Sequence, residues 1–272
     1  PTPYPCPMVE IDPTVVAYVT EVATDARTAS RQLAQLTRAA KDEVLLALAD
    51  ALEAATPAIV AANATDLRRG RDRDMAEGLL DRLMLDEDRI AAIAGAVRDI
   101  AGLPDPVGEV VRGGTVANGL EIRQVRVPMG VIGMIYEARP NVTVDAAALC
   151  LKSGNAVILR GGSTAGATNL AIVTAIRDTL VAQGISPYAV SLLDEGGHDA
   201  ARALMTARGL VDLVIPRGGA DLIQTVVRES TVPVIETGIG VNHVYVDAAA
   251  VLDSALAIVL NSKTQRPSVC NA

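Results

Sequence analysis

The chain contains three cysteines, and only one of them lies among residues that favour a reactive thiolate. Cys6, Cys150 and Cys270 are too few and too far apart for a disulfide framework or a Cys-x-x-Cys zinc site. Cys6 stands in a proline-rich tail and Cys150 in an apolar stretch, so both are predicted to be inert. Cys270 follows a polar loop in which Lys263 and Arg266 supply positive charge. Composition alone leaves an ordinary surface thiol as the alternative.

Two segments pair an arginine with two glycines ahead of a helical stretch. They are Arg160-Gly161-Gly162-Ser163 and Arg217-Gly218-Gly219. Backbone N–H groups in such a loop, with a helix N-terminus behind them, can hold a phosphate. The alternative is that the glycines only turn the chain. Residues 161–166 lack the Gly-Lys-Ser/Thr of a P-loop, and Ala165 replaces the second glycine of a Gly-x-Ser-x-Gly elbow.

Other fingerprints are incomplete. Residues 238–243 begin like a dinucleotide-binding fingerprint but lack its third glycine. The histidines, His198 and His243, stand far apart, and neither has a second ligand at metal spacing. We therefore predict surface or strand-end roles for both histidines and no metal site.

The elements that must position these residues alternate between strands and helices. Five short apolar runs, separated by helical stretches, read as strands: Val131–Tyr136, Ala156–Arg160, Ala189–Leu193, Leu210–Ile215 and Val232–Glu236. This alternation predicts an α/β fold with a parallel sheet and right-handed crossovers. Ligands of such sheets bind where the strands end, which is where both arginine-glycine segments lie.

The first 104 residues contain no such strands and read as helical. Asp12 is predicted to cap a helix that begins at Pro13. Next, the runs 109–116 and 120–127 flank Asn118-Gly119, which predicts a hairpin with a tight turn. A last helical stretch is expected over residues 249–261, followed by the polar loop 262–266.

Composition limits the class of protein. Of the 272 residues 50% are hydrophobic but only 2% are aromatic, so the core must be aliphatic, which suits a helix-covered parallel sheet. A net charge of −8 argues against a nucleic-acid or anionic-membrane partner. No apolar run reaches the roughly 18 residues of a membrane span, and the N-terminus lacks a signal-peptide layout. We expect a cytoplasmic protein.

Four segments resemble the gamma-glutamyl phosphate reductase family, a branch of the aldehyde dehydrogenase superfamily. They are residues 127–133, 136–145, 151–163 and 266–272, which include Tyr-Glu-Ala-Arg-Pro-Asn and Arg-Pro-Ser-Val-Cys-Asn-Ala. The resemblance implies an aldehyde-dehydrogenase-like fold in four parts: an N-terminal helical layer (1–104), an oligomerisation hairpin (105–128), a Rossmann-like NADP-binding core (129–248), and the start of a catalytic domain with its nucleophile loop (249–272).

The resemblance also implies a reaction. The family uses NADPH to reduce gamma-glutamyl phosphate to glutamate 5-semialdehyde, releasing phosphate, in proline biosynthesis. Cys270 matches the nucleophile that forms a thioester. Asn141 matches the asparagine whose amide donates to the oxyanion, together with the backbone N–H of Cys270.

Cofactor contacts carry over from the same resemblance. Arg160, Gly161, Gly162 and Ser163 replace the Lys-Pro-Ser-Glu string that touches the adenosine ribose in oxidative members, so Arg160 is expected to pair with the 2′-phosphate of NADPH. The turn at Arg217, Gly218 and Gly219 matches the one near the pyrophosphate. Glu236 aligns with the glutamate that activates water in oxidative members. Because water attack would waste the thioester of a reductase, we count Glu236 with the cofactor-binding residues and not as a base.

The family continues past its cysteine with a second lobe, whereas this sequence ends at Ala272. We therefore expect most contacts to the substrate's amino and carboxylate groups outside these residues, and no turnover by this chain alone. The full-length protein is expected to be a homo-oligomer acting on a small molecule. Two alternatives stay open: another acylating aldehyde dehydrogenase that uses acyl-CoA, and a non-catalytic nucleotide-binding module.

Overall fold

The computed structural model describes residues 11–238 and 241–265 of the chain. It divides into two units, one that ends at Glu236 and one that begins at Thr237. The boundary falls twelve residues before residue 248, where the sequence places the end of the nucleotide-binding core.

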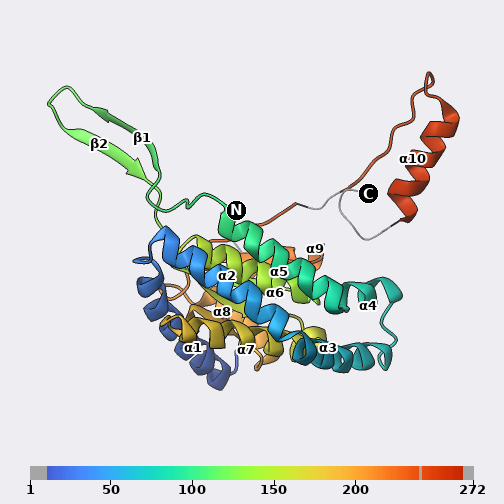
Figure 1. Ribbon diagram of the computed structural model, residues 1–272, viewed down its shortest axis with the longest axis horizontal. Coiled ribbons are helices and arrows are strands. Elements are labelled where there is room, and N and C mark those ends of the chain that lie inside the picture. The colour runs from blue at the N-terminus through green and yellow to red at the C-terminus, as the bar shows by residue number, and fades with distance from the viewer. Residues whose placement is uncertain (1–10, 239–240, 266–272) are drawn as a thin grey trace, which may run out of the picture. The chain divides into compact units, whose positions relative to one another are not determined.

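Helices make up the described part of the first unit up to Gly102 (Figure 1). They are α1 (Pro13–Leu33), α2 (Arg38–Ala54), α3 (Thr56–Arg71), α4 (Glu77–Leu83) and α5 (Glu87–Gly102). The predicted start of α1 is confirmed, because the Asp12 side chain accepts a hydrogen bond from the N–H of Thr14 and Pro13 opens the helix. No single helix among the described residues has the length and apolarity of a membrane span. Only α2 and α3 together, bent by 64° at their junction, pass that test.

The predicted hairpin is confirmed. Strands β1 (Val110–Thr115) and β2 (Glu121–Val125) pair antiparallel, and Gly119 in the connecting turn has a φ of +85°, which favours glycine. Every residue of both strands is exposed, and the hairpin extends away from the helices (Figure 1). An isolated hairpin with two exposed faces is marginally stable in water, so this one is typical of a segment that another surface covers. Its role in oligomerisation remains a prediction.

Four parallel strands form the central sheet. They are β3 (Val131–Tyr136), β4 (Ala156–Arg160), β5 (Val190–Leu192) and β6 (Leu213–Arg217), in the order β5-β4-β3-β6. The predicted parallel sheet is confirmed, with two corrections. The strand expected at 210–215 begins only at Leu213, because Leu210 and Val211 turn back onto Ala207. The strand expected at 232–236 is reduced to a single bridge between Val214 and Val234, because Pro233 has no N–H to donate.

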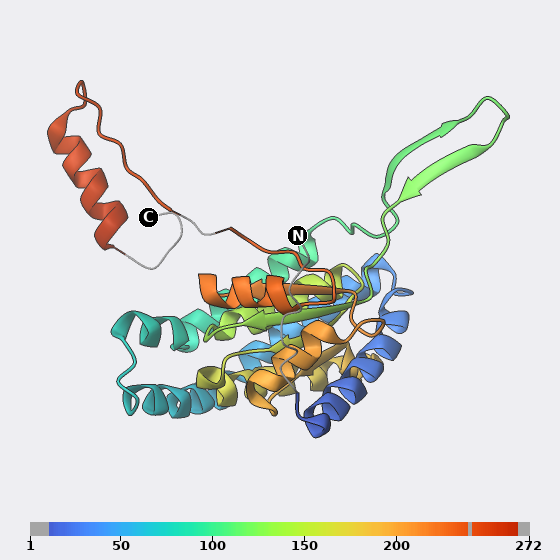
Figure 2. The same cartoon turned by 180° about the vertical axis from the view of Figure 1, so that it is seen from behind.

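Helices cover both faces of this sheet (Figure 2). Right-handed crossovers place α6 (Pro140–Lys152) and α7 (Gly166–Ala182) on one face, and α8 (Gly197–Thr206) on the other. Helix α1 packs beside α8, α2 and α5 pack over α6, and α3 packs over α7. Helix α9 (Ala220–Glu229) follows β6 and contacts α8. The core between these layers is aliphatic, as the composition predicts, with Tyr136 as a buried aromatic exception.

The second unit contains helix α10 (Leu252–Thr264). The predicted helix is present, but the loop expected at 262–266 is helical as far as Thr264. Lys263 lies in the last turn and donates to the carbonyl of Asn242 at 3.1 Å, a position in which a cation complements the helix dipole.

Two buried lysines join helices of the first unit: Lys41 joins α2 to the segment after α5, and Lys152 joins α6 to α2 and α5. The Lys41 Nζ lies 2.5 Å from Asp105 Oδ2, and these side chains are only 2% and 12% exposed. Lys152, at the end of α6, donates to Asp42 and to the carbonyl of Ala101. Burial by itself raises the pKa of Asp105, but hydrogen bonds from Lys41 and the N–H of Val107, with the charges of both lysines, leave it below the ordinary value of 3.8. Lys41 therefore stabilises the charged form of the Asp105 carboxyl group.

We expect Lys41→Met to lower the free energy of unfolding by about 3–5 kcal/mol at neutral pH, because the Asp105 carboxylate loses its buried partner. The matched control is Arg98→Met, since Arg98 pairs with Asp50 and Glu53 at the surface. Its loss should cost far less, because exposed ion pairs contribute little to stability. Urea titrations followed by circular dichroism measure both values, and equal losses for the two variants would contradict the role given to the buried pair.

Candidate functional site

The carboxyl ends of three strands meet at one edge of the sheet. Tyr136 at the end of β3 is in register with Arg217 of β6, and Ile135 is in register with Arg160 of β4. The chain runs from β3 through β4 to β5 and then returns to β6 on the other side of β3. In sheets with such a reversal, ligands bind in the crevice between the loops that follow the two strands at the switch point, which here are β3 and β6. The sheet thus brings both arginine-glycine segments and the 137–141 loop to one place.

A carboxylate from one side of this crevice reaches the helix on the other side. Glu137, directly after β3, accepts a hydrogen bond from the N–H of Gly219 at 3.0 Å, at the N-terminus of α9. The approach depends on glycine at residue 218, where a Cβ would lie 2.8 Å from the Glu137 Cδ and 2.7 Å from the Leu222 Cδ2. Arg217 itself is exposed at the end of β6. The α9 turn is therefore built for an anion, and a protein carboxylate occupies it.

Arg160 lies on the other side of β3, where its guanidinium spans two loops. It donates to the carbonyl of Gly197 from Nη2 at 2.7 Å and to the carbonyl of Gly161 from Nη1. Burial lowers its pKa, while the phenols of Tyr136 and Tyr18 act in the opposite direction. The guanidinium carries five N–H groups, so these contacts leave donors that an anion can use.

Gly161 and Gly162 hold the backbone close to its neighbours. A Cβ at residue 161 would lie 2.4 Å from the Asn169 Nδ2, and one at residue 162 would lie 3.3 Å from the N of Ala138. Asn169 is buried and its Oδ1 accepts from Thr143, but among the described residues its Nδ2 has no hydrogen-bond partner. The two glycines let the 161–163 segment approach the 137–138 loop. Ser163 is exposed and opens the 3-10 helix η1 (Ser163–Ala165).

Helix α7, which follows the first arginine-glycine segment, already has an internal cap. The carboxylate of Asp66, only 1% exposed, accepts from the N–H groups of Ala167 and Thr168 and from the Thr168 hydroxyl. A buried carboxylate with three donors holds those groups firmly. Of the two helix N-termini that the sequence offers for a phosphate, the structure thus favours that of α9.

Asn141 lies exposed in the first turn of α6, which Pro140 opens. Its Nδ2 donates to the Asp145 Oδ2 one turn later, at 3.3 Å. Burial raises the pKa of Asp145, and the hydrogen bond from Asn141 lowers it in part. Since a carboxamide carries two N–H donors, this contact orients the amide and leaves one donor for a ligand.

Of the three cysteines, only Cys150 lies among the described residues. Cys150 is buried in α6, and burial raises the pKa of its thiol to about 12, so the predicted inertness of this residue has a physical basis. Cys6 and Cys270 lie outside the described residues. The nucleophile expected at Cys270 therefore stays a prediction.

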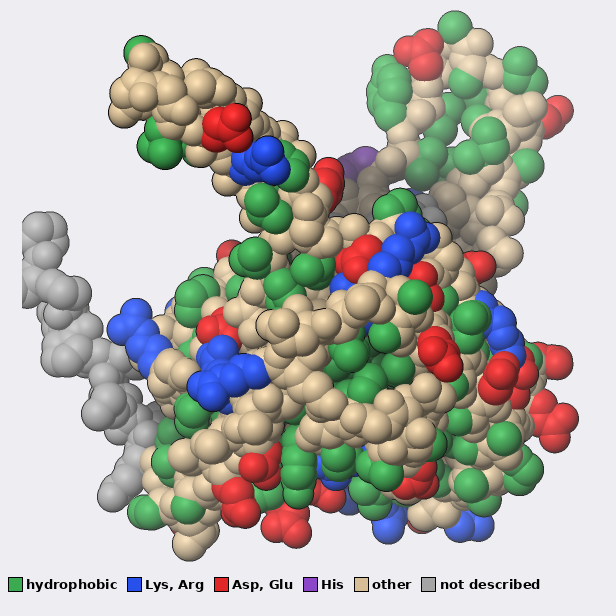
Figure 3. Space-filling model, turned by 60° about the vertical axis from the view of Figure 1, so that its left-hand side comes forward, with side chains coloured by type: hydrophobic (Ala, Val, Ile, Leu, Met, Phe, Trp, Pro, Cys, Tyr) green, Lys and Arg blue, Asp and Glu red, His purple; other side chains and the backbone are tan. Residues whose placement is uncertain are grey.

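The remaining candidates, Glu236 and the two histidines, lie at the surface. Glu236 is exposed and is the last residue of the first unit. His198 and His243 are exposed, and the described residues hold no group of three side chains that could bind a metal ion. On the face drawn in Figure 3, acidic and basic side chains are intermingled over the surface.

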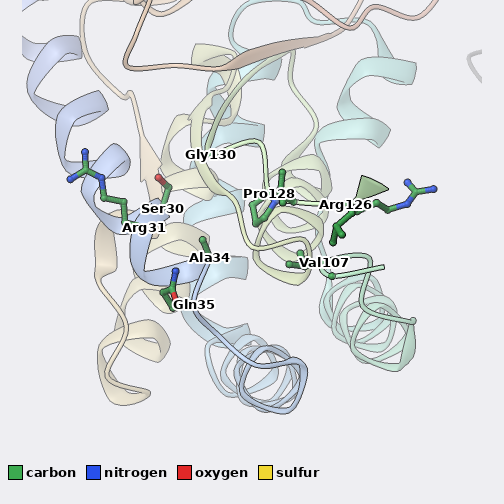
Figure 4. Close-up of a pocket in the computed structure, with 11 residues that line it drawn as sticks. Ser30, Arg31, Ala34, Gln35, Val107, Arg126, Pro128 and Gly130 are labelled. Carbon is green, nitrogen blue, oxygen red and sulfur yellow. The ribbon is translucent and has the colours of Figure 1, made fainter. Parts of the chain in front are cut away.

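A cavity of about 470 Å³ lies at the opposite end of β3 from the crevice (Figure 4). It is bounded by the end of α1, the base of the hairpin and Gly130, which directly precedes β3. Arg31 and Arg126 line it but point away from each other in Figure 4. Because this cavity lies at the amino ends of the strands, it is separate from the candidate site.

Sequence reasoning missed three polar residues of the site region: Glu137, Asp66 and Asn169. Glu137 precedes the predicted oxyanion asparagine, Asn141, by four residues, but its partner Gly219 is 82 residues away. Asp66 and Asn169 are likewise joined to the site by contacts across the fold. The contact between Asn141 and Asp145 could have been predicted from the sequence, because residues four apart in a helix are neighbours on its surface.

Comparison with known proteins agrees with this geometry. The model of the aldehyde dehydrogenase family matches residues 8–267. The chain is 61% identical over 259 residues to gamma-glutamyl phosphate reductase of Kineococcus radiotolerans, covering 95% of this chain and 60% of that protein. It is also 61% identical over 254 residues to the enzyme of the same name from Thermobifida fusca, covering 93% of this chain and 61% of that protein. The chain thus spans about 60% of the length of these curated relatives.

Solved structures show the same likeness. The gamma-glutamyl phosphate reductase of Thermotoga maritima superposes with a TM-score of 0.86 at 42% identity, covering 93% of this chain and 61% of that one. The enzyme of the same name from Saccharomyces cerevisiae gives a TM-score of 0.74 at 31% identity, covering 80% of this chain and 55% of that one. With the parallel sheet, its switch-point crevice and the family match over most of the sequence, the chain belongs to the aldehyde dehydrogenase family.

Proposed function

We propose that the protein carrying this chain reduces gamma-glutamyl phosphate to glutamate 5-semialdehyde with NADPH, in proline biosynthesis. The observation that carries the proposal is the 61% identity to a gamma-glutamyl phosphate reductase along 259 residues. The two arginine-glycine segments, which follow β4 and β6 at the same edge of the sheet, support it.

The described residues fit a dinucleotide. Gly218 and Gly219 place no side chain of their own at the start of α9, where an anion, here the Glu137 carboxylate, can accept from the N–H of Gly219. Arg160 retains donors for a 2′-phosphate, and Ser163, three residues later in the chain, is exposed. The bound cofactor would supply the hydride for the reduction.

The protein's own residues would perform the acyl transfer. The thiolate of Cys270 attacks the carbonyl carbon of the acyl phosphate, a C–S bond forms, and the C–O bond to phosphate breaks, which gives a thioester. Asn141, oriented by Asp145, would donate its second amide hydrogen to the oxyanion of the tetrahedral intermediate. After reduction of the thioester carbon, the sulfur leaves as thiolate and the aldehyde is released.

A homo-oligomer follows from the same proposal. The exposed hairpin carries apolar side chains, among them Leu120, Ile122 and Val127, which are 58%, 51% and 76% exposed. Pairing with a second copy would cover them and satisfy an open strand edge.

Cys270→Ala should lower the reduction rate by at least about 10³-fold, because no other side chain would form the thioester. Turnover is measured with the purified full-length protein, gamma-glutamyl phosphate and NADPH. A second assay replaces gamma-glutamyl phosphate with an acyl-CoA as the acyl donor. Cys150→Ala is the matched control and should retain most activity, because Cys150 is buried in α6. Substantial turnover by Cys270→Ala would contradict the mechanism, and turnover with acyl-CoA alone would assign a different substrate.

Arg160→Ser should lower the ratio of NADPH affinity to NADH affinity by about 10- to 150-fold, because it removes the contact to the 2′-phosphate. A charge-assisted contact of this kind contributes about 1.5–3 kcal/mol. Binding titrations with both cofactors measure the ratio. Arg217→Ser serves as the comparison and should weaken both cofactors alike, since the α9 turn is expected to meet the pyrophosphate they share. Lys152 is another cation that the sequence places near β4, but it is buried against Asp42 and is not available to the 2′-phosphate. An unchanged ratio in Arg160→Ser would move the 2′-phosphate contact to another residue.

A further inference from the structure

The start of α9 carries an anion that belongs to the protein itself. The Glu137 carboxylate accepts from the N–H of Gly219 at 3.0 Å, and the helix behind it has ten residues. The contact spans the crevice at the sheet's switch point, because Glu137 follows β3 and Gly219 follows β6. A second hydrogen bond, from the N–H of Glu137 to the carbonyl of Arg217 at 3.3 Å, holds the two loops together.

The glycines of this turn are matched to the carboxylate. A Cβ at residue 218 would lie 2.8 Å from the Glu137 Cδ, and one at residue 219 would lie 3.5 Å from its Oε1. Side chains at residue 218 would therefore expel Glu137 from the turn. The Glu137 side chain is also exposed, so no buried packing is lost when it leaves.

A carboxylate and a phosphate use the same donors at a helix N-terminus, and both are favoured there by the helix dipole. They cannot share the Gly219 N–H, because like charges at hydrogen-bond separation repel each other. A pyrophosphate that binds this turn must therefore displace Glu137. The Gly219 N–H is therefore paired with Glu137 when no ligand is bound. Each binding event replaces the Glu137 carboxylate with a pyrophosphate.

We propose that Glu137 is a residue that sets the affinity of the dinucleotide, by competing with its pyrophosphate for the N-terminus of α9. The inference rests on the proposed function, because it takes this turn as the place of the cofactor's pyrophosphate. Return of Glu137 to Gly219 refills the turn and so favours release of the spent cofactor. The residue acts on binding and release and has no part in the transfer of hydride.

The test measures binding of inorganic pyrophosphate, and separately of NADPH, to the 272-residue chain by calorimetry. Glu137→Gln removes the charge but keeps the length of the side chain, and it should bind pyrophosphate about two- to fivefold more tightly than the unaltered chain. The matched control is Glu195→Gln, which removes one exposed charge from the loop after β5 and should leave the affinity unchanged. Thermal unfolding verifies that the variants are folded.

A direct readout is the amide resonance of Gly219 in a nitrogen-15 spectrum. It should shift in Glu137→Gln relative to the unaltered chain, and it should shift in both on addition of pyrophosphate. Pyrophosphate affinity that is equal or weaker in Glu137→Gln would overturn the inference, as would a Gly219 resonance that pyrophosphate does not move. If NADPH binds neither form, the proposed function fails, whereas the pyrophosphate titration still decides the role of Glu137.

Discussion

The reversal of strand order beside β3 is the constraint on which the site depends. Because β4 and β6 flank β3 on opposite sides and all three strands are parallel, the loops that follow them open at one edge of the sheet. Asn141, Arg160 and Gly219 are far apart in the chain, yet each lies within a few residues of a strand end. Parallel pairing alone brings them together, and the aliphatic core between sheet and helices keeps that pairing in register.

Carboxylates of the protein accept hydrogen bonds at the N-termini of α7 and α9. At α7 the buried Asp66 fills the donors with three hydrogen bonds, and its removal would expose those groups without a partner. At α9 the exposed Glu137 makes one hydrogen bond to the first donor. The chemistry of the two caps is the same, but Asp66 is buried and Glu137 is exposed, which is why we propose that a ligand displaces only Glu137.

Two buried lysines stabilise the packing of the helical layer. Lys41 and Lys152 fix the ends of α2, α5 and α6 by their contacts. Helix α6 carries Asn141 in its first turn and Lys152 in its last. The anchor at one end of α6 therefore helps to hold the candidate oxyanion donor at the other, since a helix transmits position along its axis.

The sequence by itself determined the parallel α/β fold, the hairpin, the capped start of α1 and the family, because periodicity, turn residues and short motifs are local properties. Local signals also identified Arg160, Asn141 and the glycine turns as residues at strand ends. They did not reveal that Glu137 occupies the α9 N-terminus or that Asp66 caps α7. Only the tertiary structure decided these, because hydrogen bonds between residues 82 or 102 positions apart depend on how the sheet brings distant segments together.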